Sequence, residues 1–215
     1  MSVFNSTPPK IKQYNLITWL KENYSFFKKK KLSLIELNSE RDKNYLILIN
    51  KKPLFVVKIS NTSESKKLLE MQDYLLISFN KRSPLKNFIP KKIHSSINSY
   101  VDELGRSSYV RILTYIQGNI FAKTKHSSEL EISLGTLLGH LSKSLQNLGH
   151  ESAFRKFEWE PSSIDWVKDH INLFKNNQKK IISNSINEYN NFVKKNKKNL
   201  FQKKFIHQLI VMLMS

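Results

Sequence analysis

The sequence of 215 residues contains no cysteine. This absence excludes a disulfide framework, a thiolate zinc site and a cysteine nucleophile. The sequence also lacks the run of roughly 18 apolar residues that a membrane-spanning helix requires. Its first 30 residues lack the pattern of a secretory signal. We therefore expect a chain that works in a reducing compartment, the cytoplasm, and that does not cross a membrane.

Acidic residues and arginine are both scarce. There are 36 Lys and Arg against 17 Asp and Glu, a formal net charge of +19, yet the only arginines are Arg41, Arg82, Arg106, Arg111 and Arg155. Nucleic-acid readers favour arginine for its bidentate fork, and here the lysines are scattered along the chain. The charge therefore favours a solvated surface, and we do not expect a nucleic-acid partner. A lysine-rich RNA-binding protein is the third hypothesis, and it predicts clustered basic residues.

The apolar content of 40% is enough for a packed core. Hydrophobic periodicity predicts helices and strands up to residue 117 and helices alone after it. This change of pattern predicts an α+β chain with two parts, 1–117 and 118–215. The expected strands are 32–37, 45–49, 54–59, 93–101 and 108–116. The expected helices are 15–27, 63–79 and 127–148, with one or two more within 164–195.

The most informative single residue is Lys58, which lies inside the apolar strand 55–59. A lysine at such a position costs desolvation energy unless it has an anionic partner. Glu70 follows twelve residues later in the next helix, so we expect an ion pair between Lys58 and Glu70. The spacing is equally compatible with an edge-strand lysine that reaches water and a surface glutamate.

Four segments in order resemble the aminoglycoside-phosphotransferase-like kinase family. The similarity is greatest to its hydroxylysine-kinase branch and to kinase-like modules fused to some class III aminotransferases. The segment 150–159 is similar to a further segment of that branch, with Glu151 where proline is usual, and the whole resemblance covers about residues 12–207. The four segments are Ser39–Tyr45, Phe55–Asn61, Leu69–Gln72 and Val110–Gly118.

The resemblance implies a protein-kinase-like fold. Residues 1–117 would form a nucleotide-binding N-lobe, a five-stranded antiparallel sheet with one helix. Residues 118–215 would form the first helices of an incomplete α-helical C-lobe. The implied ligands are ATP or GTP with Mg²⁺, and a small amino-containing metabolite such as 5-hydroxylysine that receives the phosphoryl group on a hydroxyl.

The resemblance also implies roles for individual residues. Lys58 would contact the α- and β-phosphates and Glu70 would pair with it. For Arg111 a functional role and a plain salt bridge on the strand surface stay equally open. The turn over the phosphates would include Ser39, Arg41 and Asn44, and the hinge that hydrogen-bonds adenine through its backbone would include Thr114, Tyr115 and Gln117.

The sequence departs from the family pattern at the catalytic loop. His207 opens the motif, but residues 208–215 contain no base Asp and no metal-binding Asn or Asp. Loss of these groups predicts that the chain transfers no phosphoryl group. A second hypothesis is therefore a pseudokinase or regulatory fragment that binds nucleotide or a partner. The codons of residues 209–215, read one frame over, can encode Asn-Ser-Asp-Ala-Asn-Glu. We therefore expect that the chain is a frameshifted product of a kinase gene. The alternative is a genuinely short protein with an apolar tail.

Overall fold

The computed structural model describes residues 6–81, 85–145, 150–154, 164 and 166–196. The chain divides into two compact units, Met1–Ser144 and Leu145–Ser215. The first unit contains the sheet, and the predicted lobe boundary near residue 117 stays a prediction. Among the described residues no helix is both long and apolar enough to cross a membrane.

The first unit is built on a five-stranded antiparallel sheet with the strand order β1-β2-β3-β5-β4. The predicted α+β class and the predicted antiparallel sheet are confirmed. Sequential strands pair directly in the β1-β2-β3 meander, whereas β5 inserts between β3 and β4. The strands are β1 (Leu32–Leu37), β2 (Lys43–Ile49), β3 (Lys52–Ile59), β4 (Asn98–Val101) and β5 (Ser107–Thr114).

The fourth strand is shorter than the periodicity predicts. Residues 93–97 lie outside β4, and the stretch before it meets the sheet at a single bridge between Lys92 and Leu113. The side chain of His94 competes with the ladder, because its Nδ1 lies 3.3 Å from the backbone N of Ser96 and 2.8 Å from the hydroxyl of the same residue. Such local bonds offer polar residues an alternative to strand pairing.

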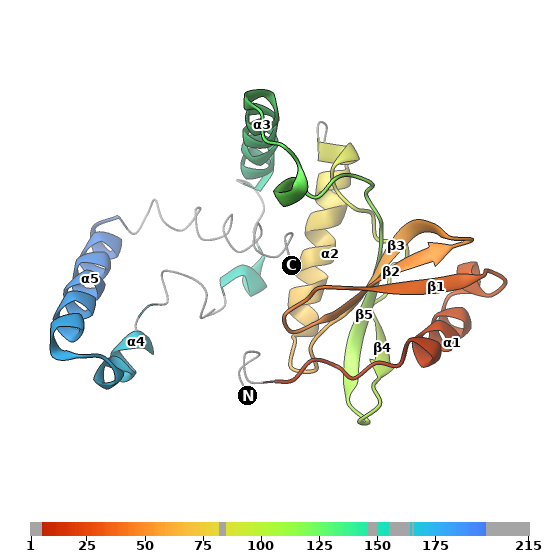
Figure 1. Ribbon diagram of the computed structural model, residues 1–215, viewed down its shortest axis with the longest axis horizontal. Helices are drawn as coiled ribbons and strands as arrows, with labels where there is room; N and C mark the ends of the chain where they lie inside the picture. Colours follow the sequence, from red (N-terminus) through yellow and green to blue (C-terminus); the bar gives the residue numbers. More distant parts are fainter. Residues whose placement is uncertain (1–5, 82–84, 146–149, 155–163, 165, 197–215) are drawn as a thin grey trace. The chain divides into compact units, whose positions relative to one another are not determined.

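Two helices cover opposite faces of the sheet (Figure 1). Helix α1 (Gln13–Asn23) buries Leu16 and Leu20 completely, and they pack into a core with the side chains of alternate strand positions. Helix α2 (Lys66–Asn80) covers the other face and buries seven residues of its own. The core on the α1 side includes Tyr45, Ile47, Val57, Ile59, Val110 and Ile112.

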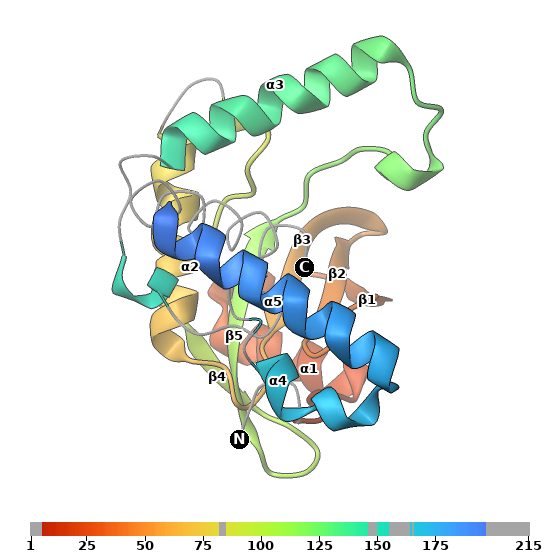
Figure 2. The same cartoon turned by 90° about the vertical axis from the view of Figure 1, so that its left-hand side faces the viewer.

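The remaining long helices are α3 (Ser128–Leu145) and α5 (Asn176–Lys195), each continuous in Figure 2. The stretch 164–195, for which one or two helices are predicted, is divided. It contains the short α4 (Trp166–Asp169), a 3₁₀ turn at Ile171–Leu173, and α5. The division falls where Leu173-Phe174-Lys175 leaves helical geometry, since Phe174 and Lys175 are extended.

Asp102 fastens the turn between β4 and β5 to the N-terminal segment. Its carboxylate accepts hydrogen bonds from the backbone N–H groups of Lys10, Leu104 and Arg106, and from the guanidinium of Arg106 at 2.7 Å. Burial alone would raise the pKa of this carboxyl, but the donors of Arg106, Lys10 and Leu104 outweigh it and lower the pKa to about 2. Arg106 in turn donates to Thr7 and Pro8.

We expect the variant Asp102→Asn to lose about 1.5–3 kcal/mol of unfolding free energy at neutral pH, the usual contribution of a hydrogen bond to a charged group. Because the pKa in the folded protein lies below that of the unfolded chain, this stabilisation is present above pH 4 and is lost as the pH falls through 2. Urea unfolding between pH 7 and pH 2 measures it. The difference from wild type should vanish in acid, whereas Glu22→Gln on the exposed side of α1 should differ little at any pH.

Candidate functional site

Three polar side chains form a row across the α2 face of the sheet. Asn44 on β2 is directly opposite Lys58 on β3, which is directly opposite Arg111 on β5. Residues opposite one another on neighbouring strands share a face, with Cβ atoms about 5 Å apart. Arg111 contacts α2, which identifies the face, and the row therefore lies in the layer between sheet and helix.

A buried carboxylate on α2 holds two cations at the end of this row. Asp73 accepts a hydrogen bond from Arg111 at 3.0 Å through Oδ1, and its Oδ2 pairs with the ammonium of Lys92. The side chains of all three are less than a tenth exposed. Arg111 also donates to Gln72, and Lys92 donates to the carbonyl of Ser95 at 3.0 Å. Of the two alternatives for Arg111, the salt bridge is therefore present, but it is buried between sheet and helix and does not lie on the surface.

The expected ion pair between Lys58 and Glu70 is also wrong. The Glu70 side chain is 52% exposed and lies 3.8 Å from Lys66, one turn earlier on α2. Glu70 belongs to the same helical stripe as Lys66, Tyr74 and Ile77, all of them exposed. The carboxylate that faces the sheet is Asp73, which shares a stripe with the buried Leu69 and Leu76. That stripe was the sequence signal that could have identified Asp73.

Lys58 is therefore a half-buried cation for which the described residues provide no ion-pair partner. Burial lowers the pKa of its ammonium group, the nearby Arg111 lowers it further, and Asp42 offsets part of this. Beside it, Asn44 is 3% exposed and its Oδ1 has no hydrogen-bond partner. Around this point the cations of Lys58, Arg111 and Lys92 outnumber the nearby carboxylates of Asp73 and Asp42, so the site attracts anions.

An apolar row runs parallel to the polar one, two residues further along the strands. It consists of Ile35, Leu46, Val56 and Leu113, paired in that order across the sheet. Leu113 is buried, Leu46 and Val56 are half-buried, and Ile35 is 51% exposed. The α2 face thus offers a partly accessible apolar surface next to a positively charged one. Ligands with a flat apolar part and an anionic part match this combination.

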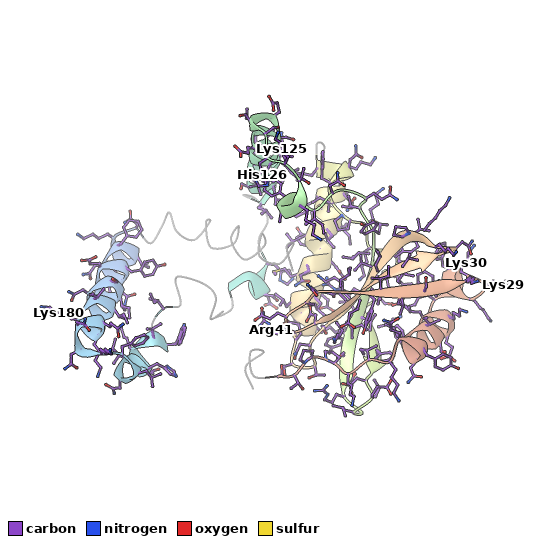
Figure 3. All side chains as sticks on the ribbon, viewed as in Figure 1. Lys29, Lys30, Arg41, Lys125, His126 and Lys180 are labelled. Atoms are coloured by element: carbon purple, nitrogen blue, oxygen red, sulfur yellow. The ribbon has the colours of Figure 1, made fainter. Side chains whose placement is uncertain are left out.

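The predicted phosphate-covering turn joins β1 to β2. Ser39 is exposed and Arg41 half-buried, whereas Asn44 lies at the start of β2 and is buried. Figure 3 shows Arg41 at one end of the sheet, with Lys29 and Lys30 at the other. Asp42 in this turn accepts a hydrogen bond from the backbone N–H of Asn61 at 2.9 Å. Asn61 lies two residues beyond β3, at the end of the family-like segment Phe55–Asn61, and the sequence indicated no role for it.

The predicted hinge is only partly available to a base. The N–H of Thr114 donates to the carbonyl of Lys91, and that of Tyr115 donates to the carbonyl of Leu54, both at 2.8 Å. Of the three predicted hinge residues, Gln117 is the one whose backbone N–H engages no acceptor in the described part of the chain. Gln117 is exposed. A bound base would therefore contact this end of the hinge.

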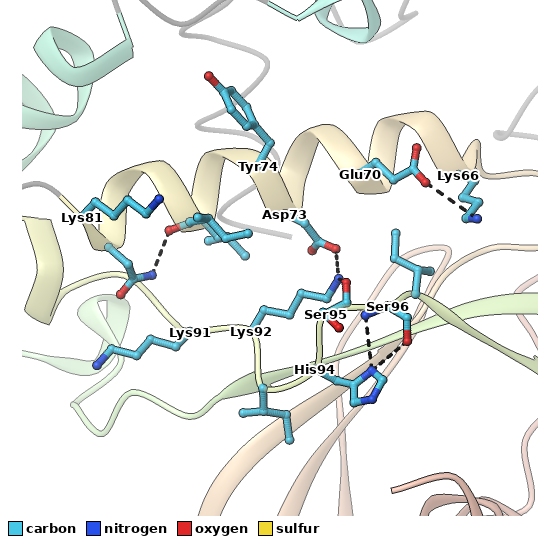
Figure 4. Close-up of a pocket in the computed structure, with 15 residues that line it drawn as sticks. Lys66, Glu70, Asp73, Tyr74, Lys81, Lys91, Lys92, His94, Ser95 and Ser96 are labelled. Atoms are coloured by element: carbon cyan, nitrogen blue, oxygen red, sulfur yellow. Dashed lines mark hydrogen bonds and ion pairs between the residues drawn. The ribbon is translucent and has the colours of Figure 1, made fainter.

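A cavity of about 800 Å³ lies between α2 and residues 91–97. Asp73 and Lys92 line it (Figure 4), so the buried ion cluster is reached from this side as well. Lys81 and Lys91 lie at one end of the cavity and the Lys66–Glu70 pair at the other. Leu76, Ile77 and Ile93 also line the cavity. Lys58 is not among the residues that line this cavity.

Some predicted features fall outside the described residues. His207 and residues 155–159 of the family-like segment belong to this group. Within the described residues no three His, Asp or Glu side chains are grouped closely enough to hold a metal ion. The residues that could hold a nucleotide are therefore those of the α2 face, the β1–β2 turn and the hinge.

Comparison of the chain with protein-family models, with curated proteins and with solved structures found no match. The class that the structure defines is an α+β protein in which α1 and α2 enclose a five-stranded antiparallel sheet, with an anion-attracting row on the α2 face.

Proposed function

We propose that the α2 face of the sheet binds the phosphates of a nucleoside triphosphate at Lys58. The observation that carries this proposal is the half-buried ammonium group of Lys58, which has no ion-pair partner among the described residues. It lies next to Arg111, and Arg111 shares its partner, the carboxylate of Asp73, with Lys92. Cations left uncompensated in a low-dielectric layer cost folding energy. An incoming phosphate would supply the missing negative charge.

The surroundings of Lys58 support the nucleotide class. The apolar row that includes Leu46 and Val56 would pack against a base, while Gln117 has a backbone N–H available for it. The β1–β2 turn lies next to Lys58 in the register of the sheet, because Asn44 at its end pairs with Lys58. The family resemblance likewise implies that ATP or GTP binds at this face, although the partner that it implies for Lys58, Glu70, lies beside Lys66 instead.

We further propose that these 215 residues bind nucleotide without transferring its phosphoryl group. A kinase needs a base that activates the acceptor hydroxyl, and Asp or Asn ligands that place Mg²⁺ on the phosphates. Residues 208–215 contain neither Asp nor Asn. The residues at hand do not fit the magnesium site of the family, so we derive no catalytic step through a metal. Nucleotide binding without catalysis is also what the pseudokinase hypothesis predicts. For an active member of the family, the resemblance favours an acceptor similar to 5-hydroxylysine.

Nucleotide titration of Lys58→Met tests the phosphate site. In calorimetry with ATP at neutral pH and no added metal, we expect at least tenfold weaker binding than wild type, about 1.4 kcal/mol. The matched control is Lys52→Met, because Lys52 is an exposed lysine on the same strand. The unfolding free energy of Lys58→Met should equal or exceed that of wild type, because burial disfavours the charged ammonium.

Two results would contradict the proposal. One is ATP affinity that is equal in wild type, Lys58→Met and Lys52→Met. The other concerns turnover, measured with ATP or GTP, Mg²⁺ and 5-hydroxylysine. Phosphorylated product that disappears in Lys58→Met would show that the catalytic groups lie elsewhere in the chain.

A further inference from the structure

Asn61 joins three segments of the chain just beyond the strand that carries Lys58. It is 1% exposed and lies between the end of β3 and the start of α2. Its side-chain amide donates to the carbonyls of Ser6 at 3.2 Å and Arg41 at 3.4 Å. Its Oδ1 accepts from the backbone N–H of Ser63 at 2.9 Å and from the hydroxyl of Ser6 at 2.5 Å. Every donor and acceptor of the amide side chain faces a neighbour.

Two hydrogen bonds of Asn61 reach the β1–β2 turn, and each engages an oxygen atom of that turn. The side chain of Asn61 binds the carbonyl of Arg41, and the backbone N–H of Asn61 binds the carboxylate of Asp42 at 2.9 Å. A loop that receives an anion must present N–H donors and keep its oxygens away from the anion. In the described part of the chain the backbone N–H groups of Ser39 and Glu40 engage no acceptor.

We propose that Asn61 is the positioning residue that makes the β1–β2 turn selective for phosphate. It holds the two acceptors of the turn, so that the donors of the turn and the ammonium of Lys58 are left for the ligand. This inference rests on the proposed nucleotide site and gives a role to a residue for which the family resemblance implied none. It predicts that the contribution of Asn61 to affinity grows with the number of phosphates on the ligand.

The test compares Asn61→Ala, Asn61→Asp and Asn80→Ala. Asn80 is the matched control, because its side-chain amide likewise donates to two carbonyls, those of Leu76 at 2.9 Å and Pro90 at 3.1 Å, but neither belongs to the turn. Asn61→Asp keeps an acceptor for Ser63 and Ser6 while it removes the donors and adds charge near Asp42. Affinities for adenosine, AMP, ADP and ATP are measured by calorimetry without added metal, and amide hydrogen exchange is followed at residues 39–44.

We expect Asn61→Ala to weaken ATP binding about tenfold and adenosine binding less than twofold, with AMP and ADP between them. Asn61→Asp should weaken ATP binding further. Asn80→Ala should weaken all four ligands equally or not at all. Exchange at residues 39–44 should become faster in the Asn61 variants only.

The outcomes separate this inference from the proposed function. If wild type binds adenosine as tightly as ATP, the phosphate site itself is refuted and the role of Asn61 with it. If wild type prefers ATP and Asn61→Ala keeps the same preference, the role of Asn61 is overturned while the phosphate site stands. Equal acceleration of exchange in Asn61→Ala and Asn80→Ala would likewise reduce Asn61 to a purely structural residue.

Discussion

Substitution of Asp73 by alanine should lower the free energy of unfolding by about 3–5 kcal/mol, the cost of leaving buried charges without their partner. Arg111 and Lys92 both depend on this carboxylate, and their side chains are 6% and 7% exposed. With Asp73 gone, two cations would stay buried without a counter-charge, close to the ammonium of Lys58. Urea or thermal unfolding of the purified protein measures the loss.

Glu70→Ala is the matched control for that variant, because it removes a carboxylate from the same helix. Glu70 forms an exposed pair with Lys66 at i, i+4, and such pairs contribute about 0.3–0.5 kcal/mol. Asp73→Asn should lie between the two, since it keeps an acceptor for Arg111 and removes the charge. A loss at Glu70 as large as that at Asp73 would mean that the carboxylate facing the sheet has been wrongly assigned.

Substitution of Phe27 by alanine should cost about 3–5 kcal/mol, because it empties a fully enclosed position in the core between α1 and the sheet. Phe27 is 0% exposed, and its ring lies edge-on to Tyr24 at 6.0 Å and to Phe55 at 5.7 Å between ring centroids. The adjacent Phe26 is the control. It is 52% exposed, so Phe26→Ala should cost about 1 kcal/mol, the worth of its aromatic contacts.

The measurement is the midpoint of urea unfolding at constant m-value for both variants. Equal losses for Phe26→Ala and Phe27→Ala would contradict the packing of this core. The comparison also tests the position of the 3₁₀ turn Ser25–Phe27, which directs Phe26 outward and Phe27 inward.

The local pattern predicted most of the sheet correctly. The strand predicted at residues 32–37 coincides with β1, and those at 45–49 and 54–59 fall inside β2 and β3. Alternation of side chains is a local property of the strand, so a few residues are enough to reveal it. The turn between β2 and β3 also depends on local sequence alone. Asn50 and Lys51 both adopt positive φ, of 50° and 67°, as a two-residue hairpin turn requires.

The site was predicted in part. Lys58 was recognised because a charge inside an apolar strand is visible without a structure. Its expected partner was chosen by distance along the sequence alone, and the choice between Glu70 and Asp73 depends on the rotation of α2 about its own axis. Three residues of helix change the direction of a side chain by about 60°, enough to move a carboxylate from the sheet to solvent.

By itself the sequence determined the class of the protein, the strands of the meander and the unusual placement of Lys58, because these follow from residue periodicity and from the cost of burying a charge. Only the tertiary structure decided that Asp73 binds both Arg111 and Lys92, and that Asn61 holds the turn before β2. These contacts join residues 19 to 38 positions apart. They depend on how helix and strands are rotated and aligned against one another. The apolar stripe of α2 indicates which of its side chains face inward, but it does not indicate which residues of the strands they meet.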